Sequence, residues 1–231
     1  MRKVDTLRTD RMVALVFRAV SLLFAITGFM AISGIFNGKF LPGIFAYYTM
    51  LSNILAILMF AMLTIQTARG LREGRKGNAG YYARFQMVCV IDILLTFIVY
   101  WVLLAPTLFT MIEGYSLWTF GNLAVHAITP LLCLLDYILF TQARHLKYRD
   151  IYYICIFPFA YVIATSIAGL LGYVYSVSPS DGLPVRFPYF FYDFDRVGIA
   201  SLAYLGSLFI FFVLIGHIFY LFDRKIRKPG I

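Results

Sequence analysis

Three polar residues share one predicted helical face inside an otherwise apolar run of this sequence. Thr49 is followed by Ser52 and Asn53 at positions i+3 and i+4, a spacing that puts all three on one side of a helix. A second apolar run holds Asn122 and His126, again at i and i+4. A hydroxyl becomes an effective nucleophile when a neutral imidazole takes its proton during the attack. The two sets therefore predict nucleophilic chemistry at a carbonyl carbon, with Thr49 as the nucleophile and His126 as the general base.

The neighbouring polar side chains suit a supporting role in the same reaction. Asn53 or Asn122 can donate a hydrogen bond to the developing oxyanion, and Ser52 can help to orient the groups around it. Counting the helix rise from the expected start of each span puts Thr49 and His126 roughly 10 and 12 Å below the same membrane face. They are therefore expected to meet. Such a reaction needs no cofactor.

The same residues also have structural interpretations. Threonine in a membrane helix usually bonds its own backbone or tightens a helix contact. A single buried histidine is more often a hydrogen-bonding member of the core than a catalyst. Pro130 frees the carbonyl of His126 from its helical partner, so a local kink also accounts for polar residues at this point. Spacing alone leaves the catalytic and the structural alternatives open.

The elements that must position these residues are membrane helices. Hydrophobic residues make up 61% of the 231-residue chain and charged residues 13%, and the mean hydropathy is +0.82. A soluble chain of this length needs more polar surface, so a soluble protein is excluded. We predict an all-α integral membrane bundle of six transmembrane helices, folded as one domain over residues 1–231, because each crossing of the hydrocarbon core needs about 20 helical residues. The apolar runs of that length lie near residues 12–36, 43–67, 85–105, 118–140, 151–176 and 197–221.

The basic residues indicate the orientation of the bundle. The chain has a formal net charge of +9, and sixteen of its 20 Lys and Arg residues fall on one side of the membrane if there are six crossings. The loops on the other side hold only Lys39, Arg186 and Arg196. The positive-inside rule then predicts a multi-pass protein of the cell membrane with both termini in the cytosol. Topology and attraction to anionic membrane lipids account for the charge, so no nucleic-acid partner is expected.

Three ionisable residues fall inside the spans, in the half nearer the cytosol. Arg18, Asp92 and Asp136 each lie roughly 10–12 Å from a flanking basic residue of their own span. An unpaired charge at that depth is costly, so we expect Arg18 to pair with one or both carboxylates as a structural clamp. A proton or ion relay is one alternative, and snorkelling of Arg18 towards the headgroups is another.

Neither a disulfide framework nor a metal site is expected. The three cysteines fall inside the predicted spans and show no paired spacing. His145 is placed in a cytosolic loop and His217 in the cytosolic half of the last span, both far from His126. The helical histidine pairs and cysteine pairs that usually bind zinc are absent from the sequence.

The last outer loop is too aromatic for a plain solvated linker. It runs from Ser176 to Arg196 and contains Tyr189, Phe190 and Asp193. One interpretation is an aromatic belt at the membrane interface. The other is a substrate lid that includes these three residues and folds over the outer mouth of the bundle.

Three short motifs give the sequence a family resemblance. Residues 47–53 read Tyr-Tyr-Thr-Met-Leu-Ser-Asn, residues 122–130 read Asn-Leu-Ala-Val-His-Ala-Ile-Thr-Pro, and residues 188–190 read Pro-Tyr-Phe with an acid following. In this order and on six spans, they resemble the androgen-induced (FAR-17a-like)/ADTRP family and its bacterial relatives. The resemblance implies a threonine hydrolase of the membrane that cleaves fatty acid esters of hydroxy fatty acids (FAHFAs). It also implies that Thr49 is the essential threonine and His126 the essential histidine.

The residues and the resemblance together predict an intramembrane lipid ester hydrolase. A lipid ester reaches the bundle from the outer leaflet or between helices, Thr49 attacks its carbonyl with His126 as base, and water opens the acyl-enzyme. The expected partners are the lipid ester and the membrane lipids. Acyl transfer to an acceptor other than water is one alternative. Another is a small-solute or ion transporter with a buried Arg/Asp cluster, although the sequence lacks the internal repeat of many carriers. A scaffold or receptor is the third.

Overall fold

Six helices of membrane-spanning length make up most of the chain, and the predicted all-α, six-span fold is confirmed. The computed structural model describes residues 10–77, 79–111, 116–141, 146–178 and 181–226. The spans are α2 (Arg11–Ile32), α3 (Tyr48–Arg72), α4 with η3 and α5 (Ala83–Val99, Tyr100–Leu104, Ala105–Met111), α6 with η4 and α7 (Phe120–Leu123, Ala124–Ile128, Thr129–Phe140), η5 with α8 (Tyr148–Cys155, Ile156–Leu170), and α9 (Ala200–Leu221) with η7 (Phe222–Ile226). The shorter elements are η1 (Ile35–Asn37), η2 (Pro42–Ala46), η6 (Phe190–Tyr192) and the paired strands β1 (Ser176–Val177) and β2 (Pro184–Val185).

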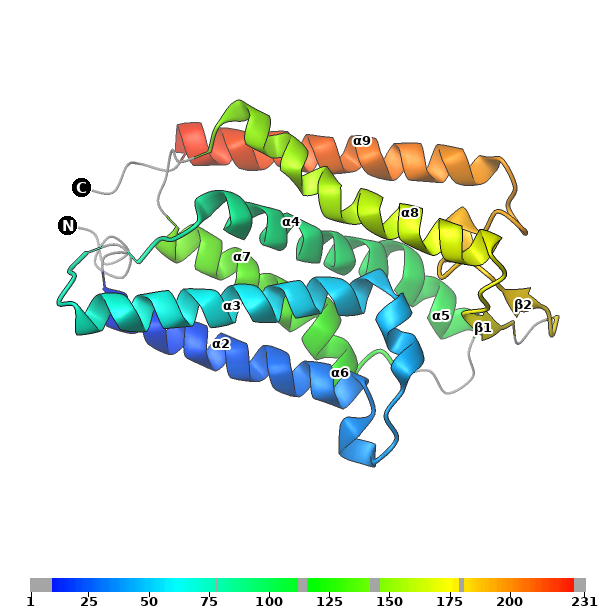
Figure 1. Ribbon diagram of the computed structural model, residues 1–231, viewed down its shortest axis with the longest axis horizontal. Helices are drawn as coiled ribbons and strands as arrows, with labels where there is room; N and C mark the ends of the chain where they lie inside the picture. The colour runs from blue at the N-terminus through cyan, green and yellow to red at the C-terminus, as the bar shows by residue number, and fades with distance from the viewer. Residues whose placement is uncertain (1–9, 78, 112–115, 142–145, 179–180, 227–231) are drawn as a thin grey trace.

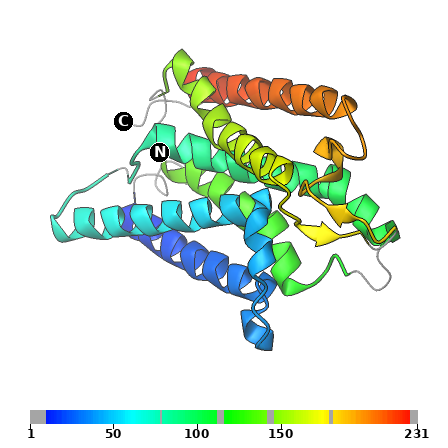
Figure 2. The ribbon, with the colours of Figure 1, turned by 45° about the vertical axis from the view of Figure 1, so that its right-hand side comes forward.

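The helices run side by side along the long axis of the molecule (Figure 1). The strands β1 and β2 lie at one end, called here the hairpin end, whereas α2 begins and α9 ends at the opposite end. The helix α4 is central, because it packs against α3 and α7 on one side and against η5 and α9 on the other. Figure 2 shows α8 and α9 as an outer pair on the far side of α4 from α2. Most of the buried residues lie in the part of the bundle around α3, α4 and α7.

The second span begins later than its hydropathy predicts. Residues Pro42–Ala46 form a separate 3₁₀ turn, and Tyr47 is extended with φ −94° and ψ 138° before α3 starts at Tyr48. Thr49 is therefore the second residue of α3, whereas the sequence placed it about six residues into the span. The prediction failed because apolar side chains continue through the 3₁₀ turn, and hydropathy does not detect a change of backbone conformation.

Three of the described spans contain a π-helical turn: η3 in the third span, η4 in the fourth and η7 at the end of the sixth. In the fourth span, Pro130 has no N–H to offer the carbonyl of His126, and the indole of Trp101 donates to this carbonyl instead, at 3.0 Å. The predicted release of the His126 carbonyl is thus confirmed. Single π turns inside α-helices are frequent at functional sites, because they rotate side chains away from the regular helical face.

Arg18 and Asp136 form an ion pair between α2 and α7, with 2.7 Å between Nε and Oδ1 and both side chains fully buried. All three guanidinium nitrogens of Arg18 donate hydrogen bonds, and Nη1 reaches the Thr67 hydroxyl at 2.7 Å and the Ala79 carbonyl at 2.8 Å. The Gln86 amide also donates to Asp136. The two buried charges are thus compensated by each other and by several hydrogen bonds.

Asp92 does not belong to this ion pair. Its Oδ1 accepts a hydrogen bond from the Tyr48 hydroxyl at 3.0 Å, and its Oδ2 has no partner among the described residues. The option that Arg18 bridges both carboxylates is therefore wrong. Each guanidinium nitrogen is already bonded to Asp136, Thr67 or Ala79, and none bonds to Asp92 on α4.

Candidate functional site

An internal cavity lies between α3, the α4–η3 segment, α8, the η6 loop and α9. Its volume is about 160 Å³, which is below the usual range of about 300–1,000 Å³ for small-molecule sites. Its walls are aliphatic, aromatic and hydroxyl-bearing, and no charged side chain is among the described residues that line it. The lining residues that carry a hydroxyl are Tyr48, Thr49, Thr96, Tyr100, Tyr161, Tyr189 and Tyr192.

Thr49 lines this cavity from the first turn of α3, with 9% of its surface exposed. The first N–H groups of any helix lack an intrahelical acceptor, and those of Tyr48 and Thr49 are in this position. Both N–H groups and the Thr49 hydroxyl lie close enough to the Tyr189 phenol to affect its pKa. Burial raises the pKa of Tyr189 to about 12, and these three groups oppose the shift. A polar oxygen is thus accommodated beside the Thr49 hydroxyl.

His126 lies in the π turn η4 and is also largely buried. Its Nδ1 is 3.1 Å from the backbone carbonyl of Asn122. A carbonyl only accepts, so in the neutral ring Nδ1 carries the proton and Nε2 is left with its lone pair, the form that a general base requires. One ring face is covered by Tyr100, with 3.6 Å between centroids and an interplanar angle of 16°. Tyr100 itself lines the cavity.

The helices that carry Thr49 and His126 are direct neighbours. The Asn53 amide, one turn below Thr49, donates to the carbonyl of Val125 at 3.1 Å and so joins α3 to η4. The two proposed catalytic side chains are not hydrogen-bonded to each other in the described structure, and His126 is not part of the cavity wall. The sequence thus identified two adjacent segments, but the expected contact between hydroxyl and imidazole is not present in this structure.

The amides expected to bind an oxyanion are used elsewhere. Asn53 donates to the carbonyls of Thr49, at 2.8 Å, and of Val125. The Asn122 amide donates to the hydroxyl of Tyr100 and to the Leu117 carbonyl. Neither residue lines the cavity. The assignment of these amides as oxyanion donors is therefore not supported, because both amide nitrogens are engaged in helix and loop contacts.

Ser52 also has a structural partner. Its hydroxyl lies 3.0 Å from the Thr49 carbonyl and 2.7 Å from the hydroxyl of Thr96. It thereby links α3 to α4 directly behind Thr49. The backbone N–H groups of Tyr48 and Thr49 are the donors that sequence reasoning missed. An exact start for α3 would have been needed to find them.

The η6 loop covers the hairpin end of the cavity. Of the residues predicted to form a lid, Tyr189 lines the cavity, whereas Phe190 points outward with 48% of its surface exposed. Phe191 and Tyr192 take the inward positions instead. The sequence missed this exchange because the turn Phe190–Tyr192 is 3₁₀-helical, so side chains do not alternate as in an extended chain.

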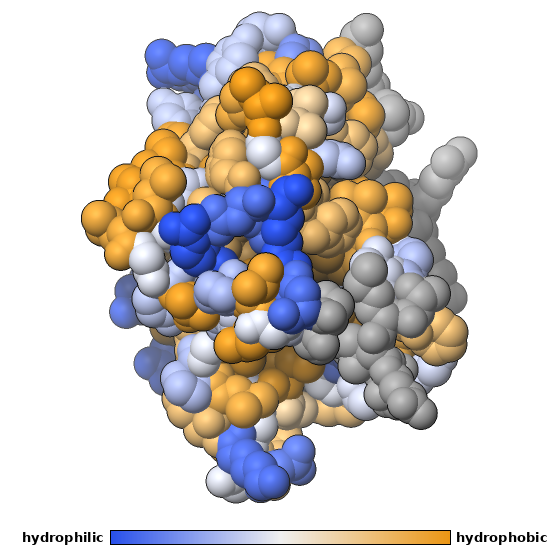
Figure 3. All heavy atoms as spheres, turned by 90° about the vertical axis from the view of Figure 1, so that its right-hand side faces the viewer, coloured by the Kyte–Doolittle hydropathy of each residue, from blue (hydrophilic) through white to orange (hydrophobic). Residues whose placement is uncertain are grey.

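Asp193 stabilises this loop through polar contacts and does not line the cavity. Its carboxylate accepts from the Asp195 N–H at 3.0 Å and pairs with Arg196 at 3.3 Å. Arg186 and Asp195 form a second ion pair beside it. Figure 3, which looks at the hairpin end, shows a hydrophilic patch surrounded by hydrophobic surface. The charged residues of the loop thus hold its turns, while its aromatic residues close the cavity.

No group of three or more His, Cys, Asp or Glu side chains is arranged to hold a metal ion in the part of the chain that the structure describes, and His145 lies outside that part. The protein is, by its fold, a polytopic helical membrane protein with an uncharged internal cavity. Comparisons with protein-family models, with curated proteins and with solved structures find no match to this chain. Its function is therefore argued from its own geometry.

Proposed function

We propose that the protein is an intramembrane lipid ester hydrolase of the cell membrane, with Thr49 as nucleophile and His126 as general base. The observation that carries the proposal is the Thr49 hydroxyl on the wall of an uncharged, aromatic cavity within the membrane spans. An elongated lipid with one uncharged polar group, such as an ester, suits these walls. The resemblance in sequence motifs favours FAHFAs as the ester class.

The proposed reaction has two steps. The Thr49 oxygen bonds to the ester carbonyl carbon while Nε2 of His126 takes the hydroxyl proton, and the alcohol then leaves with that proton as its C–O bond breaks. Water attacks the acyl-enzyme with the same base and releases the fatty acid. The N–H groups of Tyr48 and Thr49 stabilise the oxyanion, in the position where the Tyr189 oxygen lies in this structure.

This mechanism requires the hydroxyl proton of Thr49 to reach His126 during turnover. Catalytic hydrogen bonds are often long before the substrate binds, and a single water can relay the proton. The side chain of Tyr100 is the group whose displacement would bring the imidazole to the cavity, because it lines the cavity and stacks on the ring. The tautomer set by the Asn122 carbonyl is the one that this role needs.

The alternative of an ion or solute transporter gains no comparable support. Arg18 and Asp136 are sealed in a hydrogen-bonded cluster, and no charged residue lines the cavity. The positive-inside rule would put the hairpin end outside the cell, with substrate hydrolysed near the outer membrane face.

Purified protein in lipid nanodiscs tests the proposal by mass spectrometry of the fatty acid released from a FAHFA. Thr49→Val keeps the shape and removes the nucleophile, so hydrolysis should fall by about 10³-fold or more, and His126→Gln should have a similar effect. Thr129→Val is the matched control, because Thr129 is a buried threonine that does not line the cavity. Hydrolysis by Thr49→Val at the wild-type rate would disprove the mechanism.

A further inference from the structure

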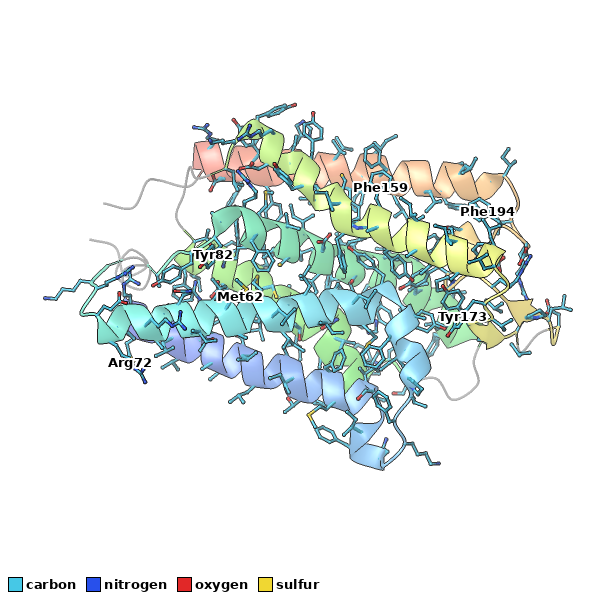
Figure 4. The ribbon with its side chains drawn as sticks, in the orientation of Figure 1. Met62, Arg72, Tyr82, Phe159, Tyr173 and Phe194 are labelled. Atoms are coloured by element: carbon cyan, nitrogen blue, oxygen red, sulfur yellow. The ribbon has the colours of Figure 1, made fainter. Side chains whose placement is uncertain are left out.

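The cavity has a mouth on the flank of the bundle, between α8 and α9. Phe159 on α8 and Phe209 on α9 both line the cavity, yet they are 48% and 41% exposed. Their ring centroids are 5.2 Å apart (Figure 4 labels Phe159). A side chain that lines an internal cavity and is also nearly half exposed stands at its opening. The two rings therefore frame this opening from opposite helices.

The fifth and sixth spans pack closely at the end of the bundle away from the hairpin and less closely towards the hairpin end. Near the opposite end, α9 approaches η5 so closely that a Cβ on Gly216 would lie 2.7 Å from the Ile154 side chain. A Cβ on Gly169, near the end of α8, would meet the backbone of Arg186. By contrast, a Cβ on Gly206 would have no neighbour within 4 Å. Figures 1 and 2 both show α8 and α9 separating towards the hairpin end.

The mouth lies at the depth of the lipid tails. Phe209 is nine residues after the start of α9 at Ala200, which is about 13 Å along the helix. This is close to the middle of a hydrocarbon core of about 30 Å. The surrounding surface is apolar, with Ile163 on α8 and Ile210 on α9 both more than half exposed. Acyl chains are the molecules that occupy this depth.

We propose that the gap between α8 and α9 is a lateral portal, gated by Phe159 and Phe209, through which the acyl chain of a bilayer lipid enters the cavity. Rotation of the two rings opens the path, since each ring has exposed surface into which it can turn. The identification of that lipid as substrate rests on the proposed function. Its ester group would lie beside Thr49, towards the hairpin end, while its chain extends to the mouth.

Photolabelling detects a lipid chain in the cavity and does not require hydrolysis. The protein is placed in vesicles of phosphatidylcholine that carries a diazirine in the middle of one chain, and labelled residues are mapped by mass spectrometry after irradiation. Labels are expected on Leu95 and Phe212, which line the cavity. Met59 and Phe60 are the controls, because they are fully buried in the core and do not line it. Labelling of Leu95 and Phe212 no stronger than of these controls would overturn the proposal.

Closing the portal tests the route itself. A variant with its three native cysteines replaced by alanine receives Phe159→Cys and Phe209→Cys, and a short bifunctional thiol reagent joins them. Labelling of Leu95 and Phe212 should fall at least tenfold, while labelling of exposed Ile163 stays the same. Each single-cysteine variant treated with the same reagent is the matched control. Undiminished labelling of the cavity after closure would refute the portal.

The outcomes separate the portal from the catalytic proposal. Failure of Thr49→Val to lower hydrolysis, with cavity labelling intact, overturns the proposed reaction and leaves the portal standing. Full hydrolysis and full cavity labelling in the joined protein overturn the portal and leave the reaction standing, with access from the hairpin end as the remaining route.

Discussion

Asn53 illustrates how a single polar residue in a membrane helix can be assigned by its partners. Its amide ties α3 to the carbonyl of Val125, so Asn53→Ala should lower the free energy of unfolding by about 1 kcal/mol, as measured for hydrogen bonds between membrane helices. Hydrolysis per folded molecule should change less than threefold, because the amide does not line the cavity. Thermal unfolding and turnover of the same detergent-solubilised sample give both quantities.

The opposite pattern would reverse that assignment. A hundredfold loss of turnover with unchanged thermal stability would return Asn53 to the role of oxyanion donor that its spacing from Thr49 suggests. Residue spacing correctly put Thr49, Ser52 and Asn53 on neighbouring parts of one helix. It did not indicate which acceptor each donor meets, because that depends on the register between α3 and η4, and no local pattern encodes this register.

The η6 loop is the element whose order should depend on pH. The Arg186 guanidinium beside Asp195 holds the pKa of that carboxyl below its usual value, with Nε and Oδ2 2.7 Å apart. Because the native pKa of Asp195 is depressed, the ion pair stabilises the loop fully at pH values above the ordinary carboxyl pKa of about 4. This contribution is lost as the pH falls through the lower native pKa. Amide exchange in residues 181–196 should therefore quicken relative to α3 as the pH falls below about 4.

Arg186→Gln is the control for this effect. It removes the charge that depresses the pKa of Asp195, so the variant should show faster exchange at neutral pH and little further change on acidification. Both side chains are more than one third exposed, so the effect should be small and should weaken at high salt. Identical pH profiles for the variant and the wild type would show that this ion pair does not order the loop.

The sequence predicted the presence of each membrane-spanning helix better than the residues at which a helix starts or changes its backbone conformation. Six runs of sufficient hydropathy are enough to identify the spans, since length and apolarity are local properties. The late start of α3 and the π turns at Tyr100 and His126 escaped prediction. Pro130 was a usable signal for the fourth span. The stacking of Tyr100 on His126, one residue from each π turn, depends on contacts between spans. Hydropathy carries no information about these contacts.

For the molecule as a whole, the arrangement of helices around α4 decides which residues can meet. Hydropathy assigned all six spans but not their neighbours, so the cavity between α3, α8 and α9 could not be foreseen. The outer pair leaves the cavity accessible from the side, whereas α2, α3, α4 and α7 pack closely against one another. The buried ion pair Arg18–Asp136 lies within that closely packed part and does not line the cavity, so we expect it to contribute to stability rather than to the proposed reaction.

A double-mutant cycle on Arg18 and Asp136 tests this division. Arg18→Met or Asp136→Leu alone leaves a buried charge without its partner and should lower the free energy of unfolding by about 3–5 kcal/mol. The double variant should be more stable than the sum of the two losses predicts, by about 1–3 kcal/mol. Thermal unfolding in nanodiscs gives these values, with Arg75→Met at the exposed Glu73–Arg75 pair as a control expected to change stability by less than about 0.5 kcal/mol. Turnover per folded molecule should remain within a few-fold of the wild type in every variant, because neither residue lines the cavity. A selective loss of turnover in stable Arg18→Met protein would instead assign the pair a direct part in function, as the transporter alternative requires.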